Sequence, residues 1–139
     1  MEKLYCTFYL DQLYYGISIS TIQEIIQNQP ILPIPLASEN VDGLINLRGH
    51  IISVLNLNRI LSGTESESEL RTLLIIYTSA GLVGLRIDDV HEIISLSEEK
   101  KEPPPATLHG NLKAFISHTY KLPESFLLIL DAESVAAVQ

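Results

Sequence analysis

The sequence predicts a mainly β protein built from two small, similar barrels of about five short strands each, with little helix. Three observations lead to this prediction: short runs of alternating apolar residues, turn residues between the runs, and an internal repeat. The chain has 139 residues, the size of one domain, so we expect both barrels to form a single unit over residues 1–139.

The internal repeat is clearest around two glycines. Residues 14–26 match residues 82–94, so that Gly84 lies 68 residues after Gly16. A later element recurs with a drifting offset, since Val54-Leu55-Asn56 resembles Ile129-Leu130-Asp131. Because a repeated pattern predicts a repeated architecture, we place one barrel near residues 14–66 and the other near 67–139, with an N-terminal strand that both barrels could share.

Each half opens with a predicted β-hairpin. Residues 4–10 and 72–77 alternate and are rich in aromatic and branched side chains, and short connections lead from them to second strands that end near Ile19 and Ile87. A short helical corner should follow each hairpin. The residue pairs with capping-box spacing at these corners are Thr21 with Glu24 and Asp89 with Glu92.

The remainder of the first half reads as a strand, a turn at Arg48-Gly49 and a strand over residues 41–57, followed by a brief helix over 57–61 that stops at Gly63. An acidic connector of small polar residues then covers 62–69. The second half repeats this order. We expect a strand over 112–117, a turn through 121–124, a strand over 126–130 and a terminal helix over 132–138.

Composition excludes several classes of function. Nine Lys and Arg against 17 Asp and Glu give a formal charge of −8, the wrong sign for neutralising nucleic-acid phosphates. No stretch approaches the roughly 18 apolar residues that span a bilayer, and no signal peptide opens the chain. With Cys6 as the single cysteine, an internal disulfide is impossible, so we expect a cytoplasmic protein without membrane insertion.

Neither catalysis nor cofactor binding is indicated by the motifs. The histidines lack metal-ligand spacing and the chain has no phosphate-binding loop or nucleophile motif, so we expect no metal, no cofactor and no enzyme activity. Glu24 and Glu92 are explained better as capping-box residues than as a catalytic pair. The four histidines are His50, His91, His109 and His118.

The motif residues resemble the CheW-like domain of bacterial chemotaxis coupling proteins. The similarity rests on Tyr15–Ile26, on Val41–Leu57 with its Gly43-Leu44-Ile45-Asn46-Leu47-Arg48-Gly49 core, and on Val83–Ile94, and it extends from about Tyr5 to about Val138. Two positions depart from the family pattern: Asn56 stands where an acidic residue is frequent, and Ser53 where proline is common.

The resemblance implies two intertwined five-stranded SH3-like barrels around a hydrophobic junction. It also implies a free-standing adaptor, monomeric on its own, that joins the cytoplasmic tips of methyl-accepting chemoreceptors to the regulatory domain of a chemotaxis histidine kinase. An apolar groove between the barrels would seat a receptor helix. The predicted protein-binding residues are Arg48, Ile22, Leu44, Leu73, Leu74 and Ile93.

Two questions stay open at the level of sequence. Arg48 is the only formal charge between Asp42 and Arg59, so it serves either as an internal latch between the barrels or as a partner contact. The rival functions are an adaptor of a pilus or second-messenger pathway and a small barrel that binds a low-molecular-weight ligand. The ligand-binding reading predicts a roomy apolar cavity between the halves.

Overall fold

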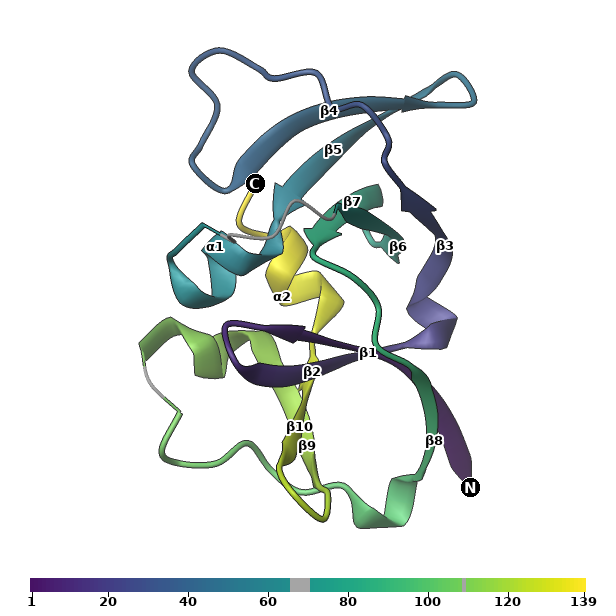
Figure 1. Ribbon diagram of the computed structural model, residues 1–139, viewed down its shortest axis with the longest axis vertical. Coiled ribbons are helices and arrows are strands. Elements are labelled where there is room, and N and C mark those ends of the chain that lie inside the picture. Colours follow the sequence, from purple (N-terminus) through teal and green to yellow (C-terminus); the bar gives the residue numbers. More distant parts are fainter. Residues whose placement is uncertain (66–70, 109) are drawn as a thin grey trace.

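Two five-stranded antiparallel-rich sheets, linked by short helices, make up the protein (Figure 1). The computed structural model describes residues 1–65, 71–108 and 110–139. The first half contains β1 (Glu2–Leu10), β2 (Leu13–Ser18), η1 (Ile19–Thr21), β3 (Ile22–Gln27), β4 (Val41–Leu47), β5 (His50–Asn56) and α1 (Leu57–Ser62). The second half contains β6 (Thr72–Thr78), β7 (Gly81–Ile87), β8 (Ile93–Ser97), η2 (Glu98–Lys100), η3 (Gly110–Phe115), β9 (Ile116–Lys121), β10 (Phe126–Leu130) and α2 (Ala132–Ala136).

The two halves exchange strands. One sheet has the order β3-β6-β7-β5-β4 and the other β8-β1-β2-β10-β9, so each sheet combines a hairpin from one half with three strands from the other. We call them barrel 1 and barrel 2, respectively. The predicted mainly β architecture with two five-stranded units is confirmed, whereas a division of the chain near residue 66 follows the sequence repeat and not the sheets.

Three apolar clusters fill the molecule. One lies within barrel 1, one within barrel 2, and the largest packs side chains of both sheets and both α-helices against each other at the junction. The junction cluster includes Phe8, Tyr15, Leu55, Leu74, Leu85, Leu128 and Val135. This packed core counts against the roomy apolar cavity that the ligand-binding reading predicted there, although cavities of about 450 Å³ and 300 Å³ open at its margins.

The repeated glycines lie at equivalent crossings of the two sheets. Gly16 pairs with Ile129 in the parallel β2–β10 ladder, and Gly84 pairs with Val54 in the parallel β7–β5 ladder. An added Cβ would lie 2.9 Å from Ile129 Cδ1 at Gly16 and 3.3 Å from Val54 Cγ2 at Gly84. The repeat therefore preserves two positions at which a neighbouring side chain occupies the space of a Cβ.

The predicted capping boxes are wrong. The helical corner η1 ends at Thr21, and Glu24 lies inside strand β3, which pairs with β6. Glu92 lies in an irregular connection whose backbone bonds to Thr7 of β1. Non-local backbone bonds, to β6 at Glu24 and to Thr7 at Glu92, override the local capping signal at both sites.

The other local predictions vary in outcome. Helix α1 begins after Asn56, whose side chain accepts from the Arg59 amide, and ends at Gly63 in the left-handed region, as expected. The strand expected over 112–117 is wrong in its first part, because η3 occupies it up to Phe115. The acidic connector expected over 62–69 lies partly outside the described residues.

No helix in the described part of the chain is long and apolar enough to cross a membrane.

Candidate functional site

Arg48 lies at the exposed tip of the β4–β5 hairpin. Arg48 and Gly49 form a two-residue turn with φ values of 52° and 88°, and the Gly49 amide donates to Asn46 Oδ1 at 2.9 Å. The Arg48 guanidinium donates to both carboxylate oxygens of Glu24, at 3.4 Å between Nη1 and Oε2 and closer between Nη2 and Oε1. Bonding to this carboxylate raises the pKa of Arg48.

The Arg48–Glu24 ion pair closes barrel 1. Glu24 belongs to β3, one edge of the sheet, and Arg48 follows β4, the opposite edge. Both partners are thus in the same barrel, so the pair does not join the two barrels. Because 65% of the Arg48 side chain is exposed, the guanidinium is also accessible to a partner at the rim of β3.

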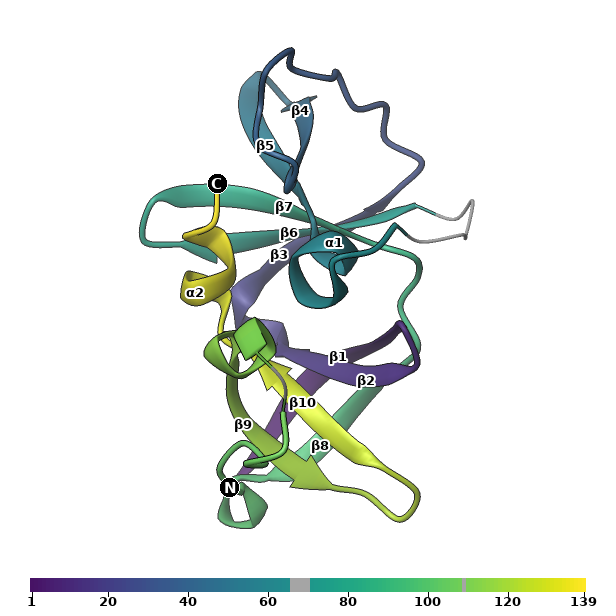
Figure 2. The same ribbon diagram turned by 90° about the vertical axis from the view of Figure 1, so that its left-hand side faces the viewer.

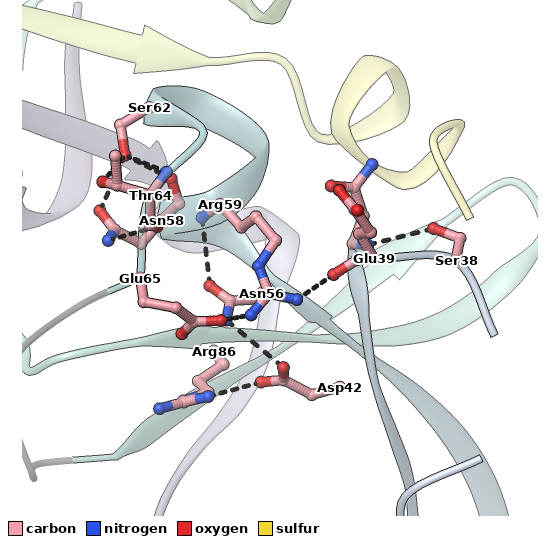
Figure 3. Close-up of polar contacts among 11 residues, drawn as sticks. Ser38, Glu39, Asp42, Asn56, Asn58, Arg59, Ser62, Thr64, Glu65 and Arg86 are labelled. Atoms are coloured by element: carbon pink, nitrogen blue, oxygen red, sulfur yellow. Dashed lines mark hydrogen bonds and ion pairs between the residues drawn. The ribbon is translucent and has the colours of Figure 1, made fainter. Parts of the chain in front are cut away.

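At the end of this hairpin opposite Arg48, a polar network links β4, β5, β7 and α1 (Figure 3). Arg86 Nη1 lies 2.9 Å from Asp42 Oδ2, and the two side chains are only 17% and 13% exposed. Asn56 donates from Nδ2 to Asp42 Oδ1 at 3.3 Å. The Asn56 amide both donates to Asp42 and accepts from the Arg59 amide, whereas an ionised carboxylate at this position could accept but could not donate to Asp42.

Beside the hairpin, the connection between β3 and β4 exposes large aliphatic side chains. Leu32, Ile34, Leu36 and Ile51 are 68%, 38%, 104% and 64% exposed, and we call these four residues the barrel-1 patch. Of these four residues, Leu32 and Ile51, which belongs to β5, line a cavity of about 460 Å³ between the connection and strands β4 and β5. Exposed apolar patches of this kind mark interaction surfaces.

Sequence reasoning missed the barrel-1 patch. The segment Pro30-Ile31-Leu32-Pro33-Ile34-Pro35-Leu36 has neither strand nor helix periodicity, and proline prevents most of it from joining a sheet. Aliphatic residues that alternate with prolines were the available signal, since such a segment cannot bury all its side chains within a ladder. Only Leu32 bridges to a strand, through Leu44 of β4.

A second cavity lies where the two barrels meet. This seam pocket, about 300 Å³, is lined from both sheets and from α2, and its lining includes Tyr77 of β6 and His118 of β9. Burial lowers the pKa of His118 to about 4, so the imidazole is neutral at physiological pH. Its Nε2 lies 3.2 Å from the Tyr5 hydroxyl. The other lining residues include Lys3, Thr21, Ser117 and Glu133.

The predicted site residues occupy different environments. Ile22 is half-buried against the junction cluster, Leu44 is half-buried and lines the cavity beneath the barrel-1 patch, and Ile93 is 54% exposed on edge strand β8. Leu73 and Leu74 are 1% and 0% exposed because β6 is an inner strand of its sheet, between β3 and β7. Their side chains therefore offer almost no surface for a partner to contact.

The described part of the chain holds no group of three or more His, Cys, Asp or Glu side chains arranged to bind a metal ion; His109 lies outside it. The surface features described above are suited to contacts with other proteins. They consist of an aliphatic patch, an accessible guanidinium beside it, and a polar pocket at the seam.

The chain is similar to known chemotaxis proteins over most of its length. The CheW-like domain family matches residues 4–139. Chemotaxis protein CheW of Treponema pallidum is 32% identical over 130 residues, 90% of this chain and 76% of that protein. Chemotaxis protein CheW of Bacillus subtilis is 28% identical over 123 residues, 87% and 78% of the two chains. The crystal structure of scaffolding protein TtCheW from Thermoanaerobacter tengcongensis aligns with a TM-score of 0.88 at 30% identity, covering 97% of this chain and 92% of that chain.

Proposed function

Because this chain belongs to the CheW-like domain family, we propose that it is a chemotaxis adaptor that couples chemoreceptors to a histidine kinase in the cytoplasm. One observation carries the proposal beyond the family assignment. The core of the junction is packed, while a pocket opens at the seam and exposed aliphatic side chains lie beside β4 and β5. These two strands are at the end of barrel 1 that faces away from barrel 2 (Figure 1). An adaptor needs two such surfaces on one rigid body.

The seam is the proposed seat of the receptor tip. A receptor tip is helical, and a pocket between the two barrels would offer such a helix contacts from both of them. Ile22 follows Thr21, which lines this pocket, and Ile93 would add an exposed apolar contact on edge strand β8. Leu73 and Leu74 would support β3 from β6, the strand that pairs with it.

The barrel-1 patch is the proposed seat of the kinase regulatory domain. Leu32, Leu44 and Ile51 line one cavity and would form an apolar centre that a partner domain desolvates, with the exposed Ile34 and Leu36 on the adjoining connection. Arg48 lies on the same hairpin as Ile51, so a charged rim borders the apolar centre, as in ordinary protein interfaces.

Calorimetric titration with a purified receptor tip and with each kinase regulatory domain of the source genome tests the proposal. The wild type should bind both partners, and the kinase that binds identifies the pathway, including a pilus or second-messenger one. Leu36→Ser should weaken kinase binding about tenfold or more without unfolding the protein, because Leu36 is fully exposed.

Two arginine variants separate a site-specific effect from a change in net charge. Arg48→Ala should weaken binding of the kinase regulatory domain, because Arg48 borders the barrel-1 patch. Arg71→Ala, which removes an exposed arginine elsewhere in the chain, should leave that binding unchanged. Failure of the folded wild type to bind any receptor tip or kinase domain at high concentration would show that the adaptor role is wrong.

A further inference from the structure

A carboxylate of barrel 2's terminal helix holds the β6–β7 turn of barrel 1. Glu133, in the first turn of α2, accepts from the Ser79 amide at 2.9 Å and 3.2 Å through its two oxygens, and from Ser79 Oγ at 2.7 Å. The helix lies directly beside this hairpin (Figure 2). The bond therefore joins the two barrels through side-chain and turn atoms, outside both sheets.

The base of this contact is rigid. Asp131 caps α2 by accepting from the amides of Glu133 and Ser134, and its own amide donates to Phe115 O at 2.8 Å. Val135, one turn further on, is 0% exposed within the junction cluster. The Glu133 carboxylate is thus presented from a helix that is fixed at both its cap and its apolar face.

The repeat provides a comparison within the same molecule. Asn56 aligns with Asp131, so the residue that matches Glu133 is Asn58 in α1. Asn58 donates from Nδ2 to Thr64 O at 3.0 Å, within its own segment, and does not hold the β1–β2 turn. Only one of the two repeat-related helix and hairpin pairs therefore carries the inter-barrel carboxylate bond.

We propose that Glu133 is a positioning residue that fixes the relative orientation of the two barrels and the width of the seam pocket. Glu133 and Tyr77 both line this pocket, and Tyr77 is two residues before Ser79 on the same hairpin. Holding Ser79 therefore sets how far Tyr77 stands from the barrel-2 side of the pocket. The effect of Glu133 on receptor binding rests on the proposed function. The effect of Glu133 on the orientation of the barrels does not.

Amide hydrogen exchange tests the bond itself. The Ser79 amide is held by the Glu133 carboxylate, so Glu133→Ala should raise its exchange rate about tenfold or more. Glu133→Gln conserves the volume and should have a smaller effect of the same sign. Glu124→Ala, which removes an exposed glutamate at the β9–β10 turn, is the matched control and should leave Ser79 unchanged.

Spin labels test the orientation of the barrels. Labels at Gln27→Cys in β3 and Lys121→Cys in β9 report on barrel 1 and barrel 2, and the native Cys6 does not interfere because it is fully buried. Glu133→Ala should broaden the distribution of label distances, and Glu124→Ala should not. Unchanged Ser79 exchange, or an unchanged distance distribution in Glu133→Ala, would overturn the proposal.

The binding measurement distinguishes the two proposals. Glu133→Ala should weaken receptor-tip binding about fivefold or more and leave kinase-domain binding unchanged, since no residue of the barrel-1 patch lines the seam pocket. Equal loss of both affinities would contradict a positioning role at the seam. If the wild type binds no receptor tip, the adaptor proposal fails, while hydrogen exchange and label distances still decide whether Glu133 fixes the barrels.

Discussion

Gly43 in β4 occupies a position that no other residue fits. Its φ is +151°, and a Cβ built on it would lie 2.2 Å from the carbonyl oxygen of Leu32 and 2.8 Å from its carbonyl carbon. Those atoms belong to the bridge in which Leu32 and Leu44 exchange backbone bonds of 2.8 Å and 2.9 Å. Gly43→Ala must therefore displace the backbone of the segment that carries the barrel-1 patch.

The expected destabilisation has two parts. Loss of the two backbone hydrogen bonds costs about 1 to 3 kcal/mol together. A non-glycine residue held at this φ costs about 1 to 3 kcal/mol more. The sum of about 2 to 6 kcal/mol is a large share of the roughly 5 to 15 kcal/mol that stabilises an ordinary domain.

Urea unfolding measures this loss, with Gly81→Ala as the matched control. Gly81 also has a positive φ, +108°, but an added Cβ meets no atom within 4 Å, so the control isolates the backbone strain. Gly43→Ala should be the more destabilising by about 1 to 3 kcal/mol, and it should speed exchange of the Leu44 amide and weaken kinase binding. Equal destabilisation by the two variants, with Leu44 exchange unchanged, would refute the reasoning.

Three further predictions concern buried groups. Arg86→Met should destabilise the fold by about 2 to 4 kcal/mol by leaving Asp42 unpaired, and adding Asp42→Asn should recover much of this loss in urea unfolding. Because burial lowers the pKa of His118 from 6.5 to about 4, the unfolded chain gains a proton first on acidification. Stability should fall between about pH 6.5 and 4 by at most about 3 kcal/mol, and His118→Gln should flatten that slope. Burial also raises the pKa of Cys6 to about 11, so a thiol-reactive reagent should modify it only at the rate of unfolding; rapid modification of the native protein would contradict this.

The sequence predicted those parts of the fold that depend on local pattern. The aligned Gly16 and Gly84 located the equivalent hairpins, and Gly63 located the end of α1. The exchange of hairpins was not predictable in this way, because a repeat identifies similar segments without naming their pairing partners. The same limit explains why Glu24 was wrongly predicted to cap a helix. It lies in β3, and β3 forms because it pairs with β6 from the other half of the chain.

The candidate site was predictable only where a charge stood out. Arg48 was conspicuous in an apolar stretch, but its partner Glu24 is 24 residues away and had a plausible local role. Leu73 and Leu74 were chosen from their place after the connector, and their burial follows from β3 and β7 flanking β6 on both sides. The barrel-1 patch lacks periodicity, so its exposure became evident only from the folded chain.

The exchange of hairpins between the halves constrains how the chain reaches its native state. Strand β1 needs β8, and the parallel β2–β10 ladder needs the last strand in the element order, so neither barrel 2 nor the junction cluster can be completed until synthesis is almost finished. Pairings this distant in sequence slow folding. Fragments 1–65 and 71–139 should each remain unfolded alone and assemble on mixing, so that the two barrels form and unfold as one cooperative unit.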